Sequence, residues 1–312
     1  MWLVSRNRRI GRDSKPEGTV YRTDRPSVVN NKSNCGMDLQ LHTCPRWRLA
    51  LGLLGTHGVS WRCEPHFSRM ARAKRRPRQV AVGMDQTPNF CRLIAYEHFV
   101  RHLDTLDTTA SLVQAAVAIS MHELDGIDPD QIASRLNKLA ARIGGRVHSG
   151  NQQALLAHLH DVLFVEEGFA GNTERYYDAG NSYLPVVLQT KRGLPIILAL
   201  LYKAVAQGVG LEAEGLNSPG HFLVQVRCGG EWMYVDPFFH GQSLSREEAF
   251  SRLEQMGGRE MPREDQILSP ATHQQWLSRI LANLQAQFAN EGRQDDLAAM
   301  TELQEALGET FY

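Results

Sequence analysis

The stretch SPGHFLVQVRCGGEWMYVDPFFHG, from Ser218 to Gly241, decides the fold. Two runs rich in β-branched and aromatic residues flank the glycine pair 229–230, and glycine pairs favour two-residue turns between antiparallel strands. In that register Cys228 faces Glu231, and each further pair lies one residue outward on both strands. The stretch therefore predicts a β-hairpin.

The hairpin would place two chemically active residues on one face. His221 opens the first strand and Asp236 closes the second. Because side chains alternate between faces with period two, the pair become diagonal neighbours at about 7 Å, which an imidazole and a carboxylate can bridge. A loop with an odd number of residues would instead place Asp236 on the other face. His221 and Asp236 are the candidate site residues, although such a pair is also common as a satisfied polar contact in a core.

A buried helix is predicted just before this hairpin, in RGLPIILALLYKAVAQGVGL from Arg192 to Leu211. Pro195 follows an Arg-Gly bend, and proline is favoured at the first helical position. The helix is apolar almost all round through Tyr202, which indicates a buried central helix. Gly208 and Gly210 mark its end.

Helical patterns occupy most of the remaining chain after Met84. Residues 86–145 contain three, with breaks at LDTLDTT and LDGIDPDQ, and Pro129 lies early in the third. A fourth pattern covers residues 152–168. The third helix is expected to bury one apolar stripe: Ile132, Leu136, Leu139 and Ile143.

After the hairpin the chain returns to helix over residues 245–256 and then over residues 273–307. The second of these patterns breaks at Asn290-Glu291-Gly292, which predicts a helical hairpin. Its apolar stripe is expected to pack onto the rest of the fold, with a groove for a partner as the alternative: Trp276, Ile280, Leu284 and Phe288.

The leading segment differs from the rest in charge. Of the 34 Lys/Arg and 34 Asp/Glu residues of the chain, residues 1–83 hold 17 and 5, which leaves 17 and 29 elsewhere. The segment lacks sustained periodicity, so we expect it to be disordered. Its basic run, residues 69–79, is at most a weak nucleic-acid or membrane-surface arm. We favour a further possibility, that the native protein starts at Met84 or Met70 and that the upstream stretch is an overextended reading frame.

No metal, cofactor or membrane partner is expected from the sequence. No stretch reaches the ~20 apolar residues of a membrane span, and we expect a cytoplasmic protein. The five cysteines include no CxxC pair, which favours reduced thiols over a disulfide framework or a zinc site. His98 and His102 could share a metal, but no third ligand is evident, so solvated or partly buried histidines are expected.

Four stretches together resemble the transglutaminase-like core of the papain-like group, and most closely its bacterial invasion-regulator (Sir-B type) branch, whose domain also occurs in some F-box proteins. They are FAGNTERYYDAGNSYL, RGLPIILALLY, PGHFLVQV and YVDPFFHG. The resemblance covers roughly residues 86–290.

The resemblance implies an α+β fold with three parts. A helical N-terminal part precedes a core with a small antiparallel sheet and a buried central helix, and a tetratricopeptide-like helical hairpin ends the chain. The expected boundaries are 1–83 for the basic segment, 84–265 for the transglutaminase-like domain with its helices, and 266–312 for the hairpin.

The same resemblance draws attention to a missing nucleophile. Active members begin the central helix with a pattern like Arg-Gly-x-Cys-x-x-x-Ala, and in RGLPIILA the cysteine position falls at Pro195. A thiolate there would gain from the helix dipole and a nearby imidazolium, whereas proline has no nucleophilic atom. A cysteine introduced at 195 is accordingly predicted to be reactive.

Other nucleophiles are poor substitutes. Cys228 lies an odd number of residues from His221 and so points to the opposite face, and Cys91 belongs to the first helix without a local base. Ser218 is interpreted as a turn residue bonding its own backbone, and Ser182 as a loop-capping hydroxyl.

Two functions remain open. The first is a non-catalytic or catalytically altered transglutaminase-like domain with a regulatory or protein-interaction role. In it, His221 and Asp236 form a vestigial or altered dyad that is retained as a structural or ligand-binding feature, and the terminal helices recruit an unidentified protein. The second is a hydrolase or acyl-transferase in which Asp236 orients His221 as a base. Neither is an active cysteine-type transglutaminase or protease.

Overall fold

The structure is a computed structural model that describes residues 87–148 and 150–308. The expectations for residues 1–83 and for the start at Met84 or Met70 therefore fall outside the described residues. The elements before the central helix are α1 (Leu93–Arg101), α2 (Thr109–Ser120), α3 (Pro129–Gly144), α4 (Gln152–His160), η1 (Asp161–Glu166), β1 (Ala170–Gly171), η2 (Ala179–Ser182), α5 (Leu184–Thr190) and β2 (Arg192–Gly193).

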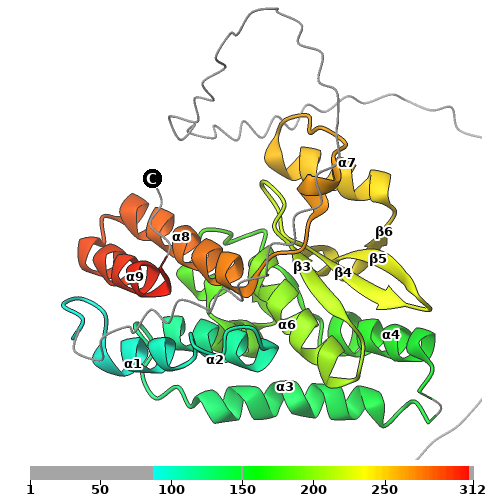
Figure 1. Cartoon of the computed structure of the whole chain (residues 1–312), viewed down its shortest axis with the longest axis horizontal. Coiled ribbons are helices and arrows are strands. Elements are labelled where there is room, and N and C mark those ends of the chain that lie inside the picture. Colours follow the sequence, from blue (N-terminus) through cyan, green and yellow to red (C-terminus); the bar gives the residue numbers. More distant parts are fainter. Residues whose placement is uncertain (1–86, 149, 309–312) are drawn as a thin grey trace, which may run out of the picture. The chain divides into compact units, whose positions relative to one another are not determined.

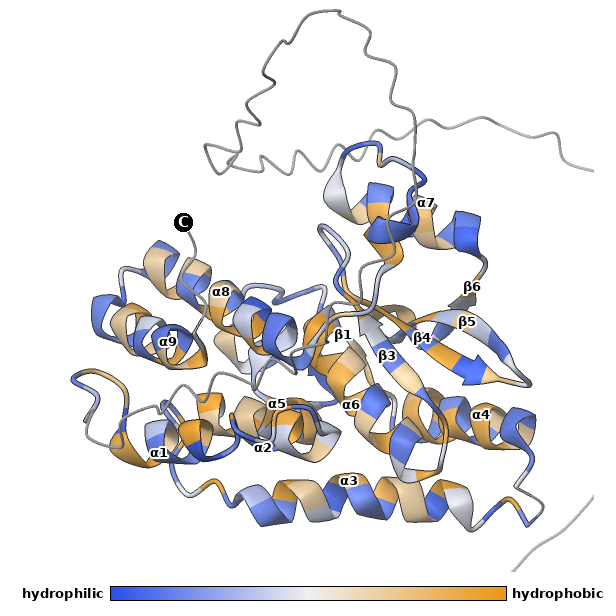
Figure 2. Ribbon diagram, in the orientation of Figure 1, coloured by the Kyte–Doolittle hydropathy of each residue, from blue (hydrophilic) through white to orange (hydrophobic). Residues whose placement is uncertain are grey.

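The three predicted N-terminal helices are confirmed, and their breaks carry the expected caps. The Thr108 side chain accepts a hydrogen bond from the backbone N–H of Ser111, and Asp128 caps α3 directly before Pro129. The predicted stripe of α3 is buried, and in Figure 2 this helix carries both hydrophilic and hydrophobic residues. The fourth helical pattern was predicted as one helix, but it changes at Asp161 from the α-helix α4 to the π-helix η1.

The central helix α6 (Pro195–Gly208) is buried along most of its length and begins with Pro195, as predicted. It ends at Gly208, and Gly210 follows with a positive φ of 84°. A short parallel pair, β1 with β2, lies directly before α6 and joins Ala170 to Arg192. This pairing was not predicted, because two-residue strands leave no periodic signal.

The hairpin of β4 (Leu223–Cys228) and β5 (Glu231–Asp236) has the predicted register, in which Cys228 pairs with Glu231. Gly229 and Gly230 have φ values of 63° and 92°, the positive values that a tight two-residue turn requires. The hairpin forms the centre of an antiparallel sheet in the order β3-β4-β5-β6. The outer strands, β3 (Ala213–Leu216) and β6 (Gln242–Leu244), were not predicted.

The sheet separates two apolar cores. One face packs towards α6 and the large core, through residues such as Val224 and Val235. The other face packs against α7 (Arg246–Gly257), which lies across the sheet from α6 in Figure 1, through residues such as Leu223 and Phe250. The helix η3 (Pro237–Phe239) connects β5 to β6, and η4 (Asp265–Leu268) follows α7.

The chain ends in a pair of helices, α8 (His273–Glu291) and α9 (Gln294–Leu307), which contact each other. Gly292 ends α8 with a φ of 72°. The predicted stripe is fully buried in the large core: Trp276, Ile280, Leu284 and Phe288, each 0% exposed. The fold is therefore α+β, as predicted, and this stripe is covered by the protein's own core.

Among residues 87–148 and 150–308, none of the helices combines the length and the hydrophobicity that a membrane crossing requires.

Candidate functional site

His221 and Asp236 lie in contact in the interior. His221 precedes β4 by two residues, and Asp236 is the last residue of β5. The Nε2 atom of His221 lies 3.0 Å from both carboxylate oxygens of Asp236. Both side chains are 0% exposed. The hairpin thus brings together the two residues that the sequence singled out.

Asp236 has more partners than the sequence indicated. Its carboxylate accepts a hydrogen bond from Nη1 of Arg252 at 2.6 Å. The backbone N–H groups of Phe238 and Phe239 donate to the same carboxylate at 3.1 and 3.4 Å. Arg252 comes from α7 and is itself only 12% exposed. The guanidinium supplies a permanent positive charge, so the buried carboxylate is compensated without a protonated His221.

Arg252 is held in place on both sides. Its Nη2 donates to Oε1 of Gln242 at 2.7 Å, and its guanidinium carbon lies 4.0 Å from the centre of the Phe239 ring. These contacts connect α7, β6 and η3 around the Asp236 carboxylate. Arg252 was not predicted as a site residue, because it belongs to an amphipathic helix and no local sequence pattern connects it to Asp236.

The second ring nitrogen of His221 has a different environment. Nδ1 is buried and has no hydrogen-bond partner among the described residues. The rings of Phe238 and Phe239 lie beside the imidazole, with centroids 5.8 and 6.2 Å away. Because Asp236 accepts from Nε2–H, Nδ1 carries a lone pair in the neutral ring. The arrangement therefore presents an acceptor atom to an apolar enclosure.

The helix α8 brings the His221 segment near the start of α6. Arg279 donates from Nη2 to the backbone oxygen of His221 at 3.2 Å and from Nη1 to that of Ser218 at 2.7 Å. One turn earlier on α8, the indole N–H of Trp276 donates to the backbone oxygen of Ile196 at 3.2 Å. Residues three apart lie on the same helix face, so the two segments are anchored next to each other.

The expected nucleophile position lies within this packed region. Pro195 is buried as the first residue of α6. Its neighbours Leu194 and Ile196 are 7% and 2% exposed. The position therefore offers neither a thiol or hydroxyl nor contact with solvent.

The other candidate nucleophiles lie elsewhere, and two of the predicted contacts were wrong. Ser218 donates to the backbone oxygen of Ile267 at 2.8 Å, a long-range contact in place of the expected bond to its own turn. Ser182 caps no loop, because its hydroxyl is buried without a partner among the described residues. The Ser218 contact depends on how the 265–268 turn packs against this segment, and the burial of Ser182 depends on how η2 packs, so neither is visible in local sequence.

The cysteines of the described residues are buried. Cys91 lies just before α1 and not within it, and burial raises the pKa of its thiol to about 12. Cys228 is 8% exposed and belongs to the large core. The Cys91 thiol, which burial holds protonated, is therefore a weak nucleophile.

The histidine pair of α1 shows ring contact without a metal-ligand geometry. The rings of His98 and His102 lie 4.8 Å apart, and Nε2 of His98 is 3.0 Å from Oε1 of Gln114. Burial, together with the neighbouring His98, lowers the pKa of His102. In the part of the chain that the structure describes, no three His, Cys, Asp or Glu side chains converge to hold a metal ion.

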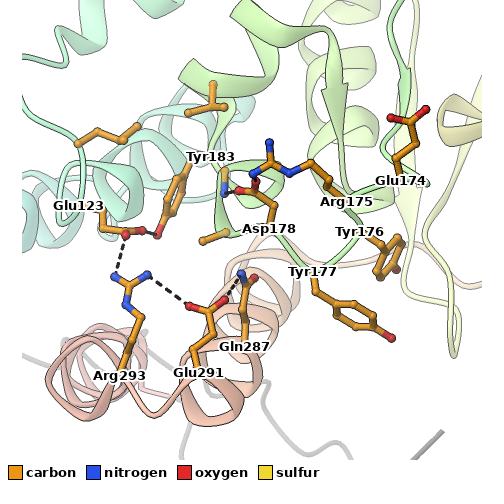
Figure 3. A pocket seen from close by; sticks show the side chains of 14 residues that line it. Glu123, Glu174, Arg175, Tyr176, Tyr177, Asp178, Tyr183, Gln287, Glu291 and Arg293 are labelled. Carbon is orange, nitrogen blue, oxygen red and sulfur yellow. Dashed lines mark hydrogen bonds and ion pairs between the residues drawn. The ribbon is translucent and has the colours of Figure 1, made fainter. Parts of the chain in front are cut away.

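A separate pocket of about 640 Å³ lies between the loop 174–180, the end of α2 and the α8–α9 corner. Figure 3 labels the side chains that line it, among them Tyr176, Tyr177, Glu291 and Arg293. His221 and Asp236 are not among the lining residues. Tyr176 contacts Phe238 at a ring distance of 6.1 Å, so these two rings lie between the pocket and His221. In the sequence, only the Gly-, Asn- and Tyr-rich stretch FAGNTERYYDAGNSYL, which contains residues 174–180, could have indicated this pocket.

Comparisons with known proteins match this architecture. A family model described as the transglutaminase-like superfamily matches residues 130–282. The UPF0162 protein of Xylella fastidiosa (strain 9a5c) is 34% identical over 196 residues, which cover 62% of this chain and 70% of that protein. F-box only protein 21 of Mus musculus is 35% identical over 105 residues, 31% of this chain and 17% of that protein.

A UPF0162 protein of Vibrio cholerae is 30% identical over 101 residues, 32% of this chain and 37% of that protein. No solved structure matches the chain. The family-model match spans α3 to α8 and includes Pro195, His221 and Asp236. The chain therefore belongs to the UPF0162 protein family and carries a domain of the transglutaminase-like superfamily.

Proposed function

We propose that the chain is a non-catalytic transglutaminase-like protein with a regulatory, protein-interaction role. The observation that carries this proposal is the complete burial of His221 and Asp236, whose side chains are 0% exposed, in a fold with Pro195 at the start of the central helix. A substrate carbonyl needs both a nucleophile and access, and removal of the nucleophile alone abolishes most of the acceleration by a catalytic triad.

The contacts of Asp236 support the same proposal. In a catalytic dyad the carboxylate stabilises an imidazolium that forms during the reaction. Here Arg252 lies 2.6 Å from Asp236 and already compensates its charge. The carboxylate therefore acts as the centre of a structural network that joins β5, η3 and α7.

The proposal also covers the branch of the superfamily, the domain boundaries and the C-terminal tail. We place the chain in the Sir-B type branch, with residues 84–265 as the transglutaminase-like domain and residues 266–312 as a tetratricopeptide-like tail. Two consecutive helices with a turn at Gly292 and a buried apolar stripe support the tail assignment. A cytoplasmic location and a protein partner complete the proposal.

A second candidate, a hydrolase or acyl-transferase, is favoured by one specific observation. Nδ1 of His221 is an unpartnered buried acceptor, and such an atom could take a proton from water or from a substrate hydroxyl. This function requires Phe238 and Phe239 to move, because their rings lie beside the imidazole.

The test is turnover of amide, ester and glutamine-donor substrates by the wild-type protein and by His221→Gln, which keeps a side chain of similar reach. We expect no turnover that depends on His221. Turnover by the wild type that His221→Gln abolishes, with the variant's melting temperature unchanged, would replace the first function by the second.

Pro195→Cys tests access directly. The sequence alone predicts a reactive thiol, because a helix N-terminus lowers the thiol pKa from ~8.5. The burial of position 195 leads to the opposite expectation, namely iodoacetamide labelling no faster than that of the buried Cys91 and Cys228. Fast labelling that slows when His221 is also replaced would mean that the site opens and that the non-catalytic assignment is wrong.

A further inference from the structure

The pocket at the α8–α9 corner has an excess of negative charge. Its lining includes four carboxylates and two guanidiniums, and its volume of about 640 Å³ is within the range of ligand sites. The carboxylates are those of Glu123, Glu174, Asp178 and Glu291, and the guanidiniums those of Arg175 and Arg293. In Figure 3, Glu123, Arg293 and Glu291 form one wall and Arg175 and Asp178 form part of another.

Arg293 is shared among three carboxylates, one of which, Asp296, also contacts Nε2 of His122 at 3.0 Å. Arg293 lies 2.7 Å from Glu123, 2.7 Å from Asp296 and 3.6 Å from Glu291. Glu291 is the most distant of the three and is 43% exposed, and its other oxygen accepts a hydrogen bond from Gln287 at 3.0 Å. The side of the pocket at Glu291 therefore keeps uncompensated negative charge in contact with solvent.

The opposite side supplies aromatic surface. Tyr177 is 68% exposed, and its ring contacts that of Tyr176 edge-on at a centroid distance of 5.3 Å. An aromatic face attracts a cation through the ring quadrupole, and arginine does so most often. Exposed tyrosine and carboxylates that line the same pocket are groups that can recognise a planar organic cation.

A bound metal ion does not fit this distribution of carboxylates. Within residues 87–148 and 150–308 they do not converge as a set of three possible ligands. A guanidinium suits the lining better, because it offers several donors in a plane to a carboxylate such as that of Glu291, and its face can stack on an aromatic ring such as that of Tyr177.

We propose that this pocket binds an arginine side chain from an extended segment of a partner protein. The proposal rests on the protein-interaction role given above and identifies the surface that carries it. The apolar stripe of α8 is buried in the core, whereas Glu291 at the end of this helix is 43% exposed, so the corner at Glu291 and Arg293 is a surface that the terminal helices offer a partner.

A partner protein fits the site better than a free small cation. Small-molecule sites enclose most of their ligand between buried walls. Here the walls are exposed, as Tyr177 at 68% and Arg175 at 77% indicate. Tyrosine and arginine are also the residues enriched where protein interfaces gain most of their binding energy.

The test is titration of the full-length chain with the peptide Ac-Gly-Ala-Arg-Ala-Gly-NH2 at low salt, followed by nuclear magnetic resonance. A second peptide carries citrulline, the uncharged isostere of arginine, and spermidine serves as a free cation. We expect saturable binding of the arginine peptide and at least a fivefold weaker affinity in Glu291→Gln and in Tyr177→Ala.

Matched variants outside the pocket keep the test specific. Glu212→Gln removes an exposed carboxylate paired with Arg227 at 3.1 Å, and Trp232→Ala removes a ring that is 41% exposed. Both are expected to bind the arginine peptide as the wild type does. Equal affinity for the citrulline peptide, unchanged affinity in the two pocket variants, or binding of spermidine without binding of the peptide would each overturn the proposal. None of these results would alter the turnover test of the non-catalytic role.

Discussion

Two polar clusters of this molecule contain the same kinds of groups in opposite surroundings. Asp236 pairs with Arg252 at 2.6 Å in the interior, where the two side chains are 0% and 12% exposed. Glu291 approaches Arg293 at 3.6 Å at a surface, where they are 43% and 30% exposed. In the interior cluster the carboxylate has a full set of donors, and at the surface its charge is shared incompletely. The difference in burial is the reason for proposing a structural role for the first cluster and a ligand site at the second.

The largest expected effect comes from breaking the interior cluster. Asp236→Asn keeps the shape of the side chain but leaves Arg252 without its counter-charge, and breaking a buried pair costs about 3–5 kcal/mol of unfolding free energy. Asp265→Asn is the matched control. It removes one partner of Arg246, in a pair at 2.7 Å whose side chains are 39% and 96% exposed. Urea unfolding should give a loss below about 1 kcal/mol for the control. Equal losses in both variants would contradict the contrast between buried and exposed pairs.

A partly buried imidazole, that of His160, sharpens the comparison, because its partner is uncharged. Nε2 of His160 lies 2.9 Å from the hydroxyl of Tyr202, and burial lowers the pKa of this histidine to about 4. In the unfolded chain the value is about 6.5, so the unfolded state binds more protons between those values. Stability is therefore full above about pH 6.5 and falls as the pH drops towards 4, by up to about 3 kcal/mol.

His160→Gln removes this proton uptake and should flatten the fall in unfolding free energy over that pH window. The control is His148→Gln, at an exposed position, which should follow the wild-type curve. The measurement is the unfolding free energy of the wild type and of both variants from pH 7 to pH 4. A His160→Gln curve parallel to the wild type would mean that His160 does not titrate with folding.

The smallest expected effect concerns the ring of Phe238, which lies with that of Tyr176 between His221 and the pocket. A Cβ atom at Gly171 would lie 2.3 Å from the ring of Phe238, which lies beside His221. Gly171→Ala should displace that ring and lower the melting temperature, because overpacking of this kind costs about 1–3 kcal/mol of unfolding free energy. Gly144→Ala, where an added Cβ meets nothing within 4 Å, should be neutral or slightly stabilising. An unchanged melting temperature in Gly171→Ala would mean that the Phe238 ring can move without loss of stability, which contradicts the prediction.

The parts of the fold that followed from sequence are those with local causes. The glycine pair at 229–230 determines the hairpin register, and Pro129 and Pro195 mark helix starts because proline loses nothing at a first helical position. The outer strands β3 and β6 were missed, since four- and three-residue strands do not reveal a period of two.

Only the part of the candidate site that lies on one hairpin could be predicted from the sequence. His221 and Asp236 are joined by β4 and β5, so alternation of faces was sufficient to pair them. Arg252 and Arg279 reach the pair from α7 and α8, and such contacts depend on how helices pack over the sheet. The extent of burial likewise depends on the assembled fold, and it is burial that separates a structural pair from a reactive one.

One carboxylate connects the two ends of the described fold. Glu302, on α9, accepts hydrogen bonds from the backbone N–H groups of Asn89, Phe90 and Cys91, at distances from 2.8 to 3.2 Å. It thereby satisfies backbone donors of the three residues that directly precede Arg92, the N-cap of α1. A unit whose first and last helices meet in this way can be inserted into a loop of a longer chain without stretching its host. The proximity of the segment before α1 to α9 would thus allow the same unit to occur within proteins of different length.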